Sequence, residues 1–441
     1  MKVLFKMNFK YIKRTQALLL IVLVFDGSSL HAAEAKSGTS EIKMGKYTTL
    51  SGAVKRVIKI NPGLEAKRSQ YNAALQIPDQ VGALPEPQLI LNALSLPLDG
   101  FSLTQTPMTQ LQMGISQQFP YPGKLDLQEE VAIKESLASK ESIYSNSKSL
   151  IRQVKHLWWQ LFYIDRALDT VESNMELMEE FIDVAETKYT VGQGLQQEVL
   201  LAHVELAKLE DSKIQITGMR ERVEADFNAL LSQDAATRVF INKNVDATLP
   251  TVQSLAQLVK QAHSARPEIR QAKFKIEASE GRVELAEKDY YPDFKLGAVY
   301  GWRKERTGLA NVKFSMNLPF NTEKRQDRKK DQRTHELLNK KYVLADLKDS
   351  VSKEIAQAMA DFDRASQQML IYQDRILPQA EQTVDSMLAG YQVNKVDFLN
   401  LLRSQLNLFN FQTQYWQALS AANQAIAALE YAVGSEAIYE Q

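Results

Sequence analysis

Residues 294–302 read FKLGAVYGW, with an apolar side chain at every odd step and lysine, glycine or valine between. Residues 311–318 (NVKFSMNL) and 111–116 (LQMGIS) alternate in the same way. Strict alternation with a period of two is typical of β-strands that have one apolar and one polar face. Strands of about nine residues can cross a bilayer when they are tilted. The same pattern also fits a half-buried sheet in a soluble protein, so the strands alone leave both alternatives open.

The chain consists of two similar halves, because short motifs recur in the same order. A duplicated unit of about 200 residues accounts for these matches. We predict a first repeat at residues 48–250 and a second at 251–434, each with a helix, two strands and two long helices. Residues 88–96 alternate poorly and are predicted to be a strand from their place in the repeat. The matches are Pro62 to Pro87 with Pro267 to Pro292, 118–121 with 317–320, and 188–192 with 390–394.

Between these motifs the sequence predicts helices of unusual length. Residues 125–188 contain neither glycine nor proline. At ~1.5 Å per residue, one helix over this region would be roughly 95 Å long. Its counterpart in the second half contains Pro378, where we expect a kink or a break. Shorter helices are predicted over residues 64–81 and 268–288.

The helix that ends each repeat carries an apolar stripe. In residues 195–230 apolar side chains recur at alternating spacings of four and three, interrupted only at Lys213 and Arg220. The same register recurs in residues 401–432. A seven-residue repeat held over several heptads is typical of a coiled-coil seam.

The N-terminal region, residues 1–33, has the features of a secretory signal peptide. Basic residues precede the apolar run at 17–25 (ALLLIVLVF), and small residues follow it, so we expect cleavage between Ala32 and Ala35. The run is shorter than the ~20 apolar residues that a spanning helix needs. The sequence therefore predicts an exported protein without a transmembrane helix.

Composition excludes several classes of function. The 441 residues include no cysteine, which excludes disulfide scaffolds, cysteine-based zinc sites, iron–sulfur clusters and thiol enzymes. Lys and Arg together number 53 and so do Asp and Glu, so no nucleic-acid partner is indicated. None of the five histidines lies one helical turn from another, and no nucleotide-binding or hydrolase motif is present. We expect no enzymatic activity, no cofactor and no metal site.

The predicted strands need partners. Four strands cannot close a barrel, since closure takes at least about eight. An isolated sheet would also leave two edges exposed. Either the helices of the same chain cover the sheet, or several chains contribute strands to one barrel. The helices are too long and too narrowly striped to fold back as a cover, which favours the shared barrel.

This arrangement resembles the outer-membrane efflux protein family, typified by TolC, from about residue 48 to 434. The resemblance lies in the duplicated proline-bounded helices, the strand pairs and the Tyr-x-Val turns. Residues 118–124 (QFPYPGK), 376–381 (ILPQAE) and 397–402 (DFLNLL) look like the heavy-metal branch, which serves cobalt, zinc, cadmium and copper efflux.

The resemblance implies a mainly α protein with a β-barrel part. Three copies would form a 12-stranded barrel in the cell outer membrane and a long α-helical coiled-coil barrel in the periplasm. The homotrimer would be the passive exit channel of a tripartite efflux pump, with a periplasmic adaptor protein and an inner-membrane efflux transporter. Resemblance to the heavy-metal branch implies heavy-metal cations as the exported substrate. Type I protein secretion and drug efflux are alternatives within the same fold, and a soluble periplasmic coiled-coil adaptor is an alternative from another class.

The resemblance also implies a gate at the periplasmic mouth. A hydrogen bond between Glu198 and Tyr391 would help to close it. Asn400 and Arg403 fall where TolC has acidic, pore-facing residues, and a ring of Arg403 would repel cations. The adaptor would dock at the two turns, on Tyr189, Val191, Gly192, Val393 and Asn394.

One motif has two interpretations. Residues 324–330 (KRQDRKK) are locally basic but contain interspersed acids. They are predicted either to lie on a solvated helix face or to sit at the periplasmic rim of the barrel near lipid headgroups.

Overall fold

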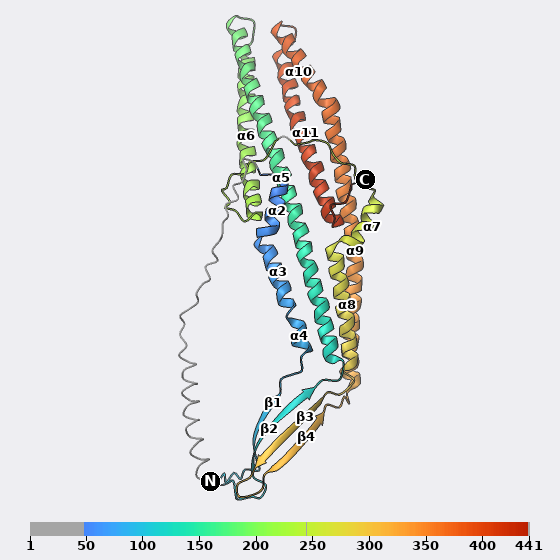
Figure 1. Cartoon of the computed structure of the whole chain (residues 1–441). Helices are drawn as coiled ribbons and strands as arrows, with labels where there is room; N and C mark the ends of the chain where they lie inside the picture. Colours follow the sequence, from blue (N-terminus) through green and yellow to red (C-terminus); the bar gives the residue numbers. More distant parts are fainter. Residues whose placement is uncertain (1–47, 244, 440–441) are drawn as a thin grey trace. The chain divides into compact units, whose positions relative to one another are not determined.

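The computed structural model describes residues 48–243 and 245–439, which are mostly helical and include one four-stranded sheet (Figure 1). The predicted signal peptide lies outside the described residues. Within the described residues, no helix combines the length and apolarity that a membrane span requires. The sheet lies at one end of the long helices, and the turns between paired helices lie at the other end (Figure 1).

Both halves pass through helix, strand pair, long helix, turn and long helix. The first half contains α2 (Leu50–Ile60), α3 (Pro62–Ala74), α4 (Ile77–Gly82), β1 (Gln88–Leu94), β2 (Gln110–Phe119), α5 (Lys124–Thr190) and α6 (Gln196–Leu230). The second half contains α7 (Leu255–Ala265), α8 (Pro267–Lys288), β3 (Phe294–Trp302), β4 (Leu309–Met316), the 3₁₀ turn η1 (Thr322–Lys324), α9 (Gln326–Ile371), the π-helical turn η2 (Tyr372–Ile376), α10 (Leu377–Gln392) and α11 (Phe398–Val433).

Two prolines decide where helices stop. The single helix predicted over residues 64–81 is wrong, because α3 ends at Ala74 and α4 begins at Ile77. Continuation would press the ring of Pro78 against the carbonyl of Ala74, four residues earlier, and remove a hydrogen bond. At Pro378, where a kink or a break is predicted, the regular α-helix is interrupted by the π-helical turn η2, which separates α9 from α10.

α5 is one continuous helix of 67 residues, as the absence of glycine and proline predicts. It packs against α6, α8 and α11, and so connects the two halves. Near its middle, Trp158, Trp159 and Phe162 are buried together, with ring centroids 5.0–6.2 Å apart. These aromatic residues therefore serve packing between helices.

The predicted stripe on α6 is buried in part. Ala202, Leu209, Val223 and Phe227 are buried, whereas Leu195 at its start is exposed. Arg220, which interrupts the stripe, is buried as well. On α11 the stripe is buried at Leu401, Leu408, Ala418, Ala422, Ala425, Leu429 and Ala432.

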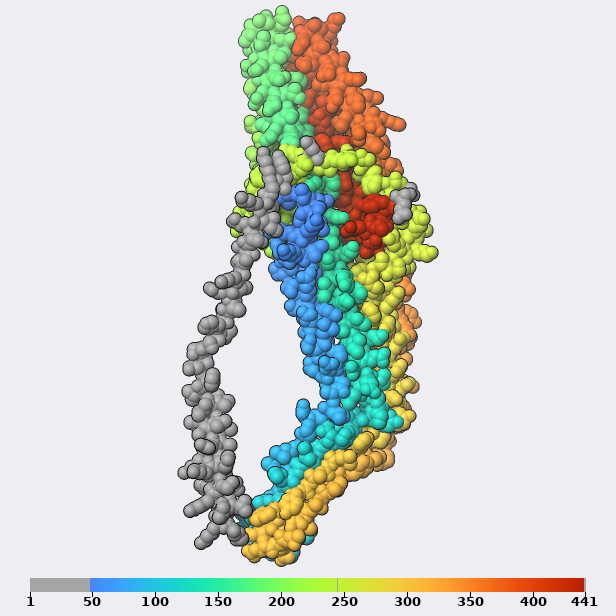
Figure 2. Space-filling model, viewed as in Figure 1, coloured from blue at the N-terminus to red at the C-terminus, as the bar shows by residue number. Residues whose placement is uncertain are grey.

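The sheet is antiparallel, with the strand order β1-β2-β3-β4 and nothing paired to the outer edge of β1 or β4 within the described residues. Its register places apolar residues opposite one another, since Met113 pairs with both Leu91 and Tyr300, and Tyr300 pairs with Ala310. One face of the sheet is therefore mostly apolar, with Gln117 as a polar member opposite Leu296. That face is exposed, with exposed fractions of 67% for Leu91 and 84% for Val312, and the described helices extend away from the sheet in Figure 2.

The other face of the sheet carries small and polar side chains packed closely together. A Cβ atom on Gly114 would lie 2.4 Å from the carbonyl oxygen of Ala298, and one on Gly301 would lie 1.7 Å from Oε1 of Gln110. The contact at Gly114 is with backbone, so glycine is required there, whereas at Gly301 the Gln110 side chain would have to move. Glycine in a strand often marks such a close approach or a bend of the sheet.

An extended segment between α6 and α7 joins both halves at mid-height. Ile241 forms a β-bridge with Thr48, and Val252 forms one with Tyr439 near the C-terminus. Val239 and Ile241 are buried in the same cluster as the α5 tryptophans. This crossing segment, residues 231–254, connects the beginning, the middle and the end of the described chain.

Candidate functional site

The two helical turns at the end remote from the sheet have the same backbone geometry. The N–H of Gln193 donates to the carbonyl of Lys188 at 2.8 Å, and the N–H of Lys395 donates to that of Gly390 at 2.9 Å. In each case the N–H donor lies five residues after the carbonyl acceptor. This hydrogen bond is typical of the Schellman motif, which ends a helix when the residue before the donor has the left-handed backbone conformation. Gly192 has φ 76° and Asn394 has φ 60°, as that motif requires.

The helices after these turns start differently. The carboxylate of Asp397 accepts a hydrogen bond from the N–H of Asn400 at 2.8 Å and caps α11. At the start of α6 the cap comes from inside the helix, where Glu198 Oε2 accepts from the N–H of Leu195 at 3.4 Å. Glu198 is thereby held at the rim of the turn, with an oxygen directed toward the second half.

Tyr391 links the two hairpins. Its hydroxyl donates a hydrogen bond to Glu198 Oε2 over 3.3 Å, and its ring lies 5.5 Å from that of Phe398. The side chain is only 3% exposed. Burial, together with the charge and the hydrogen bond of Glu198, raises the pKa of Tyr391 to about 12. The phenol is therefore a fixed, neutral donor at physiological pH.

Lys188 forms a second link that the sequence did not indicate. Its Nζ donates to the carbonyl of Tyr391 and, at 2.5 Å, to Oδ1 of Asn394. The same ammonium lies 4.1 Å from the centroid of the Tyr391 ring. A cation at the C-terminal end of α10 is favoured by the helix dipole and satisfies carbonyls that have no partner in the helix. The position equivalent to Lys188 in the second half is Gly390, which has no side chain. The first half therefore makes this contact with the second half, and the second half makes no equivalent contact in return.

Below these polar links the hairpins share an apolar cluster. Met178, Phe181 and Ala185 of α5 are buried against Leu401 and Leu402 of α11. Met178 is part of this cluster, and Met175, one turn earlier on α5, packs at its edge. Both methionines therefore serve packing. Among the described residues, no group of three or more His, Cys, Asp or Glu side chains could hold a metal ion.

The structure brings Glu198 and Tyr391 together but leaves Asn400 and Arg403 apart from them. Asn400 is exposed, and its amide donates to Asp397 at 3.0 Å. Arg403 is exposed and forms no ion pair with another described residue. The predicted docking residues Tyr189, Val191 and Val393 are exposed at the turns, as are Gly192 and Asn394.

One exposed stripe of α11 is almost free of charge. Its residues recur at spacings of three and four along the face opposite the buried stripe, so they form one continuous surface. Arg403 is its single charged member. The stripe consists of Asn400, Arg403, Asn407, Asn410, Gln414 and Gln417.

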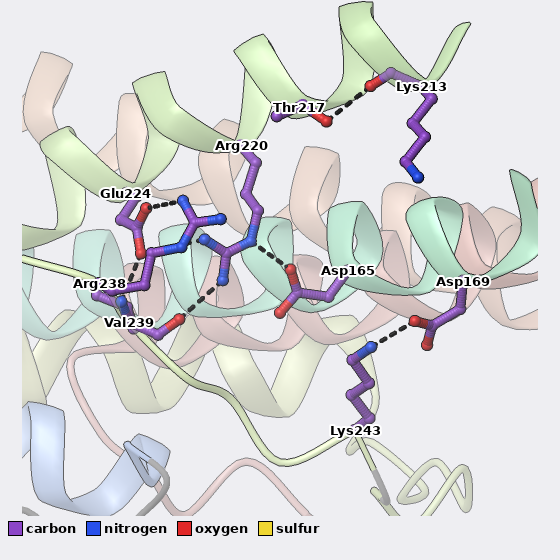
Figure 3. A network of polar contacts seen from close by, with 9 residues as sticks. All are labelled: Asp165, Asp169, Lys213, Thr217, Arg220, Glu224, Arg238, Val239 and Lys243. Carbon is purple, nitrogen blue, oxygen red and sulfur yellow. Dashed lines mark hydrogen bonds and ion pairs between the residues drawn. The ribbon is translucent and has the colours of Figure 1, made fainter. Parts of the chain in front are cut away.

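A buried ion network fixes α6 on α5 and holds the crossing segment in place (Figure 3). Arg220 reaches from α6, donates from Nε to Asp165 of α5 at 2.6 Å, and donates from Nη2 to the carbonyl of Val239 at 2.8 Å. Its Nη1 lies 3.1 Å from Glu224, one turn farther along α6. Burial disfavours the charge of Arg220, but the two carboxylates outweigh this effect and raise its pKa.

The periphery of this network joins the same three elements. Glu224 accepts from the N–H of Val239 and pairs with Arg238 at 3.1 Å, while Lys243 pairs with Asp169 (Figure 3). In the sequence, Arg220 is visible only as an interruption of the apolar stripe. A charged residue at a seam position is itself a signal of a buried pair, but the sequence does not show which acids it meets.

Comparisons with known proteins agree with this geometry. Residues 258–435 match the family model described as outer membrane efflux protein. No curated protein sequence matches the chain.

Several solved structures are similar over most of the chain. CusC, from a study of its folding and transmembrane channel formation, has a TM-score of 0.76 and 17% identity, covering 88% of this chain and 93% of CusC. The outer membrane protein VceC of Vibrio cholerae has a TM-score of 0.74 and 18% identity, covering 88% and 96%. The outer membrane channel MtrE of Neisseria gonorrhoeae, in its open state, has a TM-score of 0.72 and 14% identity, covering 88% and 89%. Residues 258–435 are thus similar to the outer membrane efflux protein family, and the described chain has the fold of these solved outer-membrane channels.

Proposed function

We propose that three copies of this chain assemble into the passive exit channel of a tripartite efflux pump in the cell outer membrane. The observation that carries this proposal is the sheet, which has an open apolar face and two unpaired edges. Three sheets of four strands side by side remove all edges and make a 12-stranded barrel, within the range of known outer-membrane barrels. Each copy contributes the two predicted repeats, residues 48–250 and 251–434.

The apolar face has the dimensions and the borders that a bilayer requires. β3 has nine residues, enough for a tilted strand to cross the hydrocarbon core. Stacked aromatic rings lie across its helix-proximal end, where Phe294 is 5.4 Å from Phe119 and 6.4 Å from Phe314. Tyr300 and Trp302 border the far end. Aromatic girdles at both edges of an apolar band are typical of membrane barrels.

The helices supply the periplasmic part of the conduit. Identical copies placed around the axis of the barrel bring their paired helices side by side, and the nearly uncharged stripe of α11 is suited to face water in a passage. The Glu198–Tyr391 link lies at the end remote from the membrane. We assign this end as the mouth, where the exposed turn residues Tyr189, Val191 and Val393 would meet a periplasmic adaptor and, through it, an inner-membrane transporter.

The chain itself would act as a conduit and not as an enzyme, with the transporter supplying the energy. Heavy-metal cations are the proposed cargo, on the resemblance of residues 118–124, 376–381 and 397–402 to the metal branch. Arg403 counts against a cation-selective constriction, because a ring of three arginines would disfavour cations in the passage. Drug efflux and type I protein secretion are the other candidate cargoes of the same channel.

Two experiments separate these levels of the proposal. Reconstitution of the purified protein into planar bilayers tests the channel, and we expect discrete conductance steps; no conductance and full solubility without detergent would favour a periplasmic adaptor instead. A deletion strain tested for tolerance of zinc, cobalt, cadmium, copper, dyes and antibiotics tests the cargo. Loss of metal tolerance alone supports the metal branch, and unchanged metal tolerance contradicts it.

A further inference from the structure

A polar pocket of about 810 Å³ lies where the sheet meets the helices. Its wall comes from the start of α5, the segment between α8 and β3, the end of β4 and the start of α9. It therefore sits beside the helix-proximal aromatic row of the sheet. Its charged lining residues are Lys124, Asp289, Asp293, Arg325 and Lys329.

Inside the pocket, a lysine holds the junction together. Lys124, which is buried, places its Nζ 2.9 Å from Asp293 Oδ1 and 3.2 Å from Asp289 Oδ1. Asp293 also accepts from the N–H of Tyr121 at 2.8 Å, and Asp289 pairs with Lys329 at 2.5 Å. The two acids of the pocket are thus fully engaged by two lysines.

Arg325 is the third cation of the pocket, and neither of the two lining carboxylates pairs with it. Its guanidinium forms no ion pair or hydrogen bond with any other described residue, and the side chain is exposed. It occupies the N-cap position of α9, where no side chain caps the first N–H groups. Three lining cations face two lining carboxylates, so the pocket has an unbalanced positive charge next to unsatisfied helix donors. Both features favour an anion.

Besides the polar Asn317 and Gln326, the remaining wall is mostly apolar, and it continues the exposed apolar face of the sheet. Met316 and Leu318 line the pocket and extend the apolar pattern of β4, and Phe320 just beyond is 85% exposed. Tyr291, also in the lining, stacks on Tyr121 with ring centroids 4.4 Å apart. A ligand that fits this site must combine an anionic group with an apolar body.

We propose that this junction pocket binds the phosphate headgroup of an anionic phospholipid in the periplasmic leaflet, with Arg325 as its principal charged contact. The inference rests on the proposed function, which places the sheet in the outer membrane. Aromatic rings lie at the level of the headgroups in a membrane interface, so the cations directly behind them lie at the level of the phosphates. The pocket would fix the height of each copy in the bilayer.

Native mass spectrometry of the detergent-purified protein tests this inference, with phosphatidylglycerol and phosphatidylcholine as probes. We expect phosphatidylglycerol to bind more tightly than phosphatidylcholine. Arg325→Gln should weaken phosphatidylglycerol about fivefold, or about 1 kcal/mol, and leave phosphatidylcholine unchanged. Arg364→Gln is the matched control, since it removes an equal charge from an exposed part of the same helix roughly 58 Å away.

Each outcome decides the matter. Equal binding of the two lipids by the unmodified protein, or unchanged phosphatidylglycerol binding by Arg325→Gln, overturns the site. Displacement of the lipid by inorganic phosphate alone shows a general anion pocket and also overturns the lipid assignment. If the protein neither retains any phospholipid nor conducts in bilayers, the channel proposal fails with it, whereas conductance with no Arg325 effect rejects the pocket alone.

Discussion

The hydroxyl of Tyr391 meets Glu198 Oε2 across the two hairpins at 3.3 Å, while Tyr189, at the equivalent place in the first half, is 47% exposed. The two tyrosines share the same local sequence pattern and the same turn geometry. Only Tyr391 points into the space between the halves. The two halves therefore contain one tyrosine that connects the hairpins and one that lies on the surface.

Removing the Tyr391 hydroxyl is expected to favour the open mouth. Tyr391→Phe keeps the ring and loses one partly buried hydrogen bond to a carboxylate, worth about 1 kcal/mol. The ratio of open to closed channels in planar bilayers should rise about fivefold for each of the three links that opening breaks. Tyr189→Phe is the matched control and should conduct like the unmodified channel. Equal behaviour of the two variants would remove Tyr391 from the gate.

The same phenol predicts a dependence on alkaline pH. A folded-state pKa of about 12 lies above the value of about 10 for an exposed tyrosine. The contribution of the phenol is therefore complete below pH 10 and is lost as the pH rises toward 12. In thermal melts, the difference in Tm between the unmodified protein and Tyr391→Phe should be constant from pH 7 to 9 and should decline above pH 10. A difference that stays constant above pH 10 would show that the phenol is not held in its neutral form.

The buried Lys188 is expected to stabilise the tip of α10. Lys188→Met removes the ammonium that donates to the carbonyl of Tyr391 and to Oδ1 of Asn394, a loss of charged hydrogen bonds worth about 1–3 kcal/mol. Hydrogen exchange of the α10–α11 turn should accelerate accordingly. Lys208→Met, on an exposed stretch of α6 with only a surface pair to Glu205, should change exchange little. An unaffected turn in Lys188→Met would mean that water replaces the ammonium without cost.

The buried ion pair between Arg220 and Asp165 is expected to contribute to stability as a unit. Arg220→Met strands the buried carboxylate of Asp165 and should cost about 3–5 kcal/mol. Adding Asp165→Leu removes the stranded charge, so the double variant should recover part of the lost Tm. Arg238→Met, whose side chain is about half exposed, should have a much smaller effect. Additive losses in the double variant would show that Arg220 and Asp165 do not act as a pair.

The strands and the long helices could be predicted because their signals are local. The alternation in residues 294–302 and the absence of glycine and proline in 125–188 each specify one element without reference to the rest of the chain. Pro378 likewise indicates an interruption of the helix from its own position in the sequence alone. Pro78 does not specify its element in the same way, because a proline in the first turn of one helix and a proline inside a longer helix have similar sequence surroundings.

The site was predictable only where family resemblance supplied it. Glu198 and Tyr391 were paired by resemblance, and their contact depends on packing between elements 193 residues apart in sequence. Lys188 and Arg220 have unremarkable sequence neighbours, and their partners lie on other helices. Long-range pairing of this kind leaves no periodic signal in a single sequence.

The central claim is that this chain is one third of a membrane-embedded conduit, and the mass of the purified particle tests it most directly. Native mass spectrometry after removal of the detergent should give three copies of the mature chain, each somewhat below the 49.9 kDa of the full sequence. The particle should also need detergent to stay dispersed. A stable single copy that is monodisperse in plain buffer would contradict the account, because its apolar sheet would then have to be covered by its own helices.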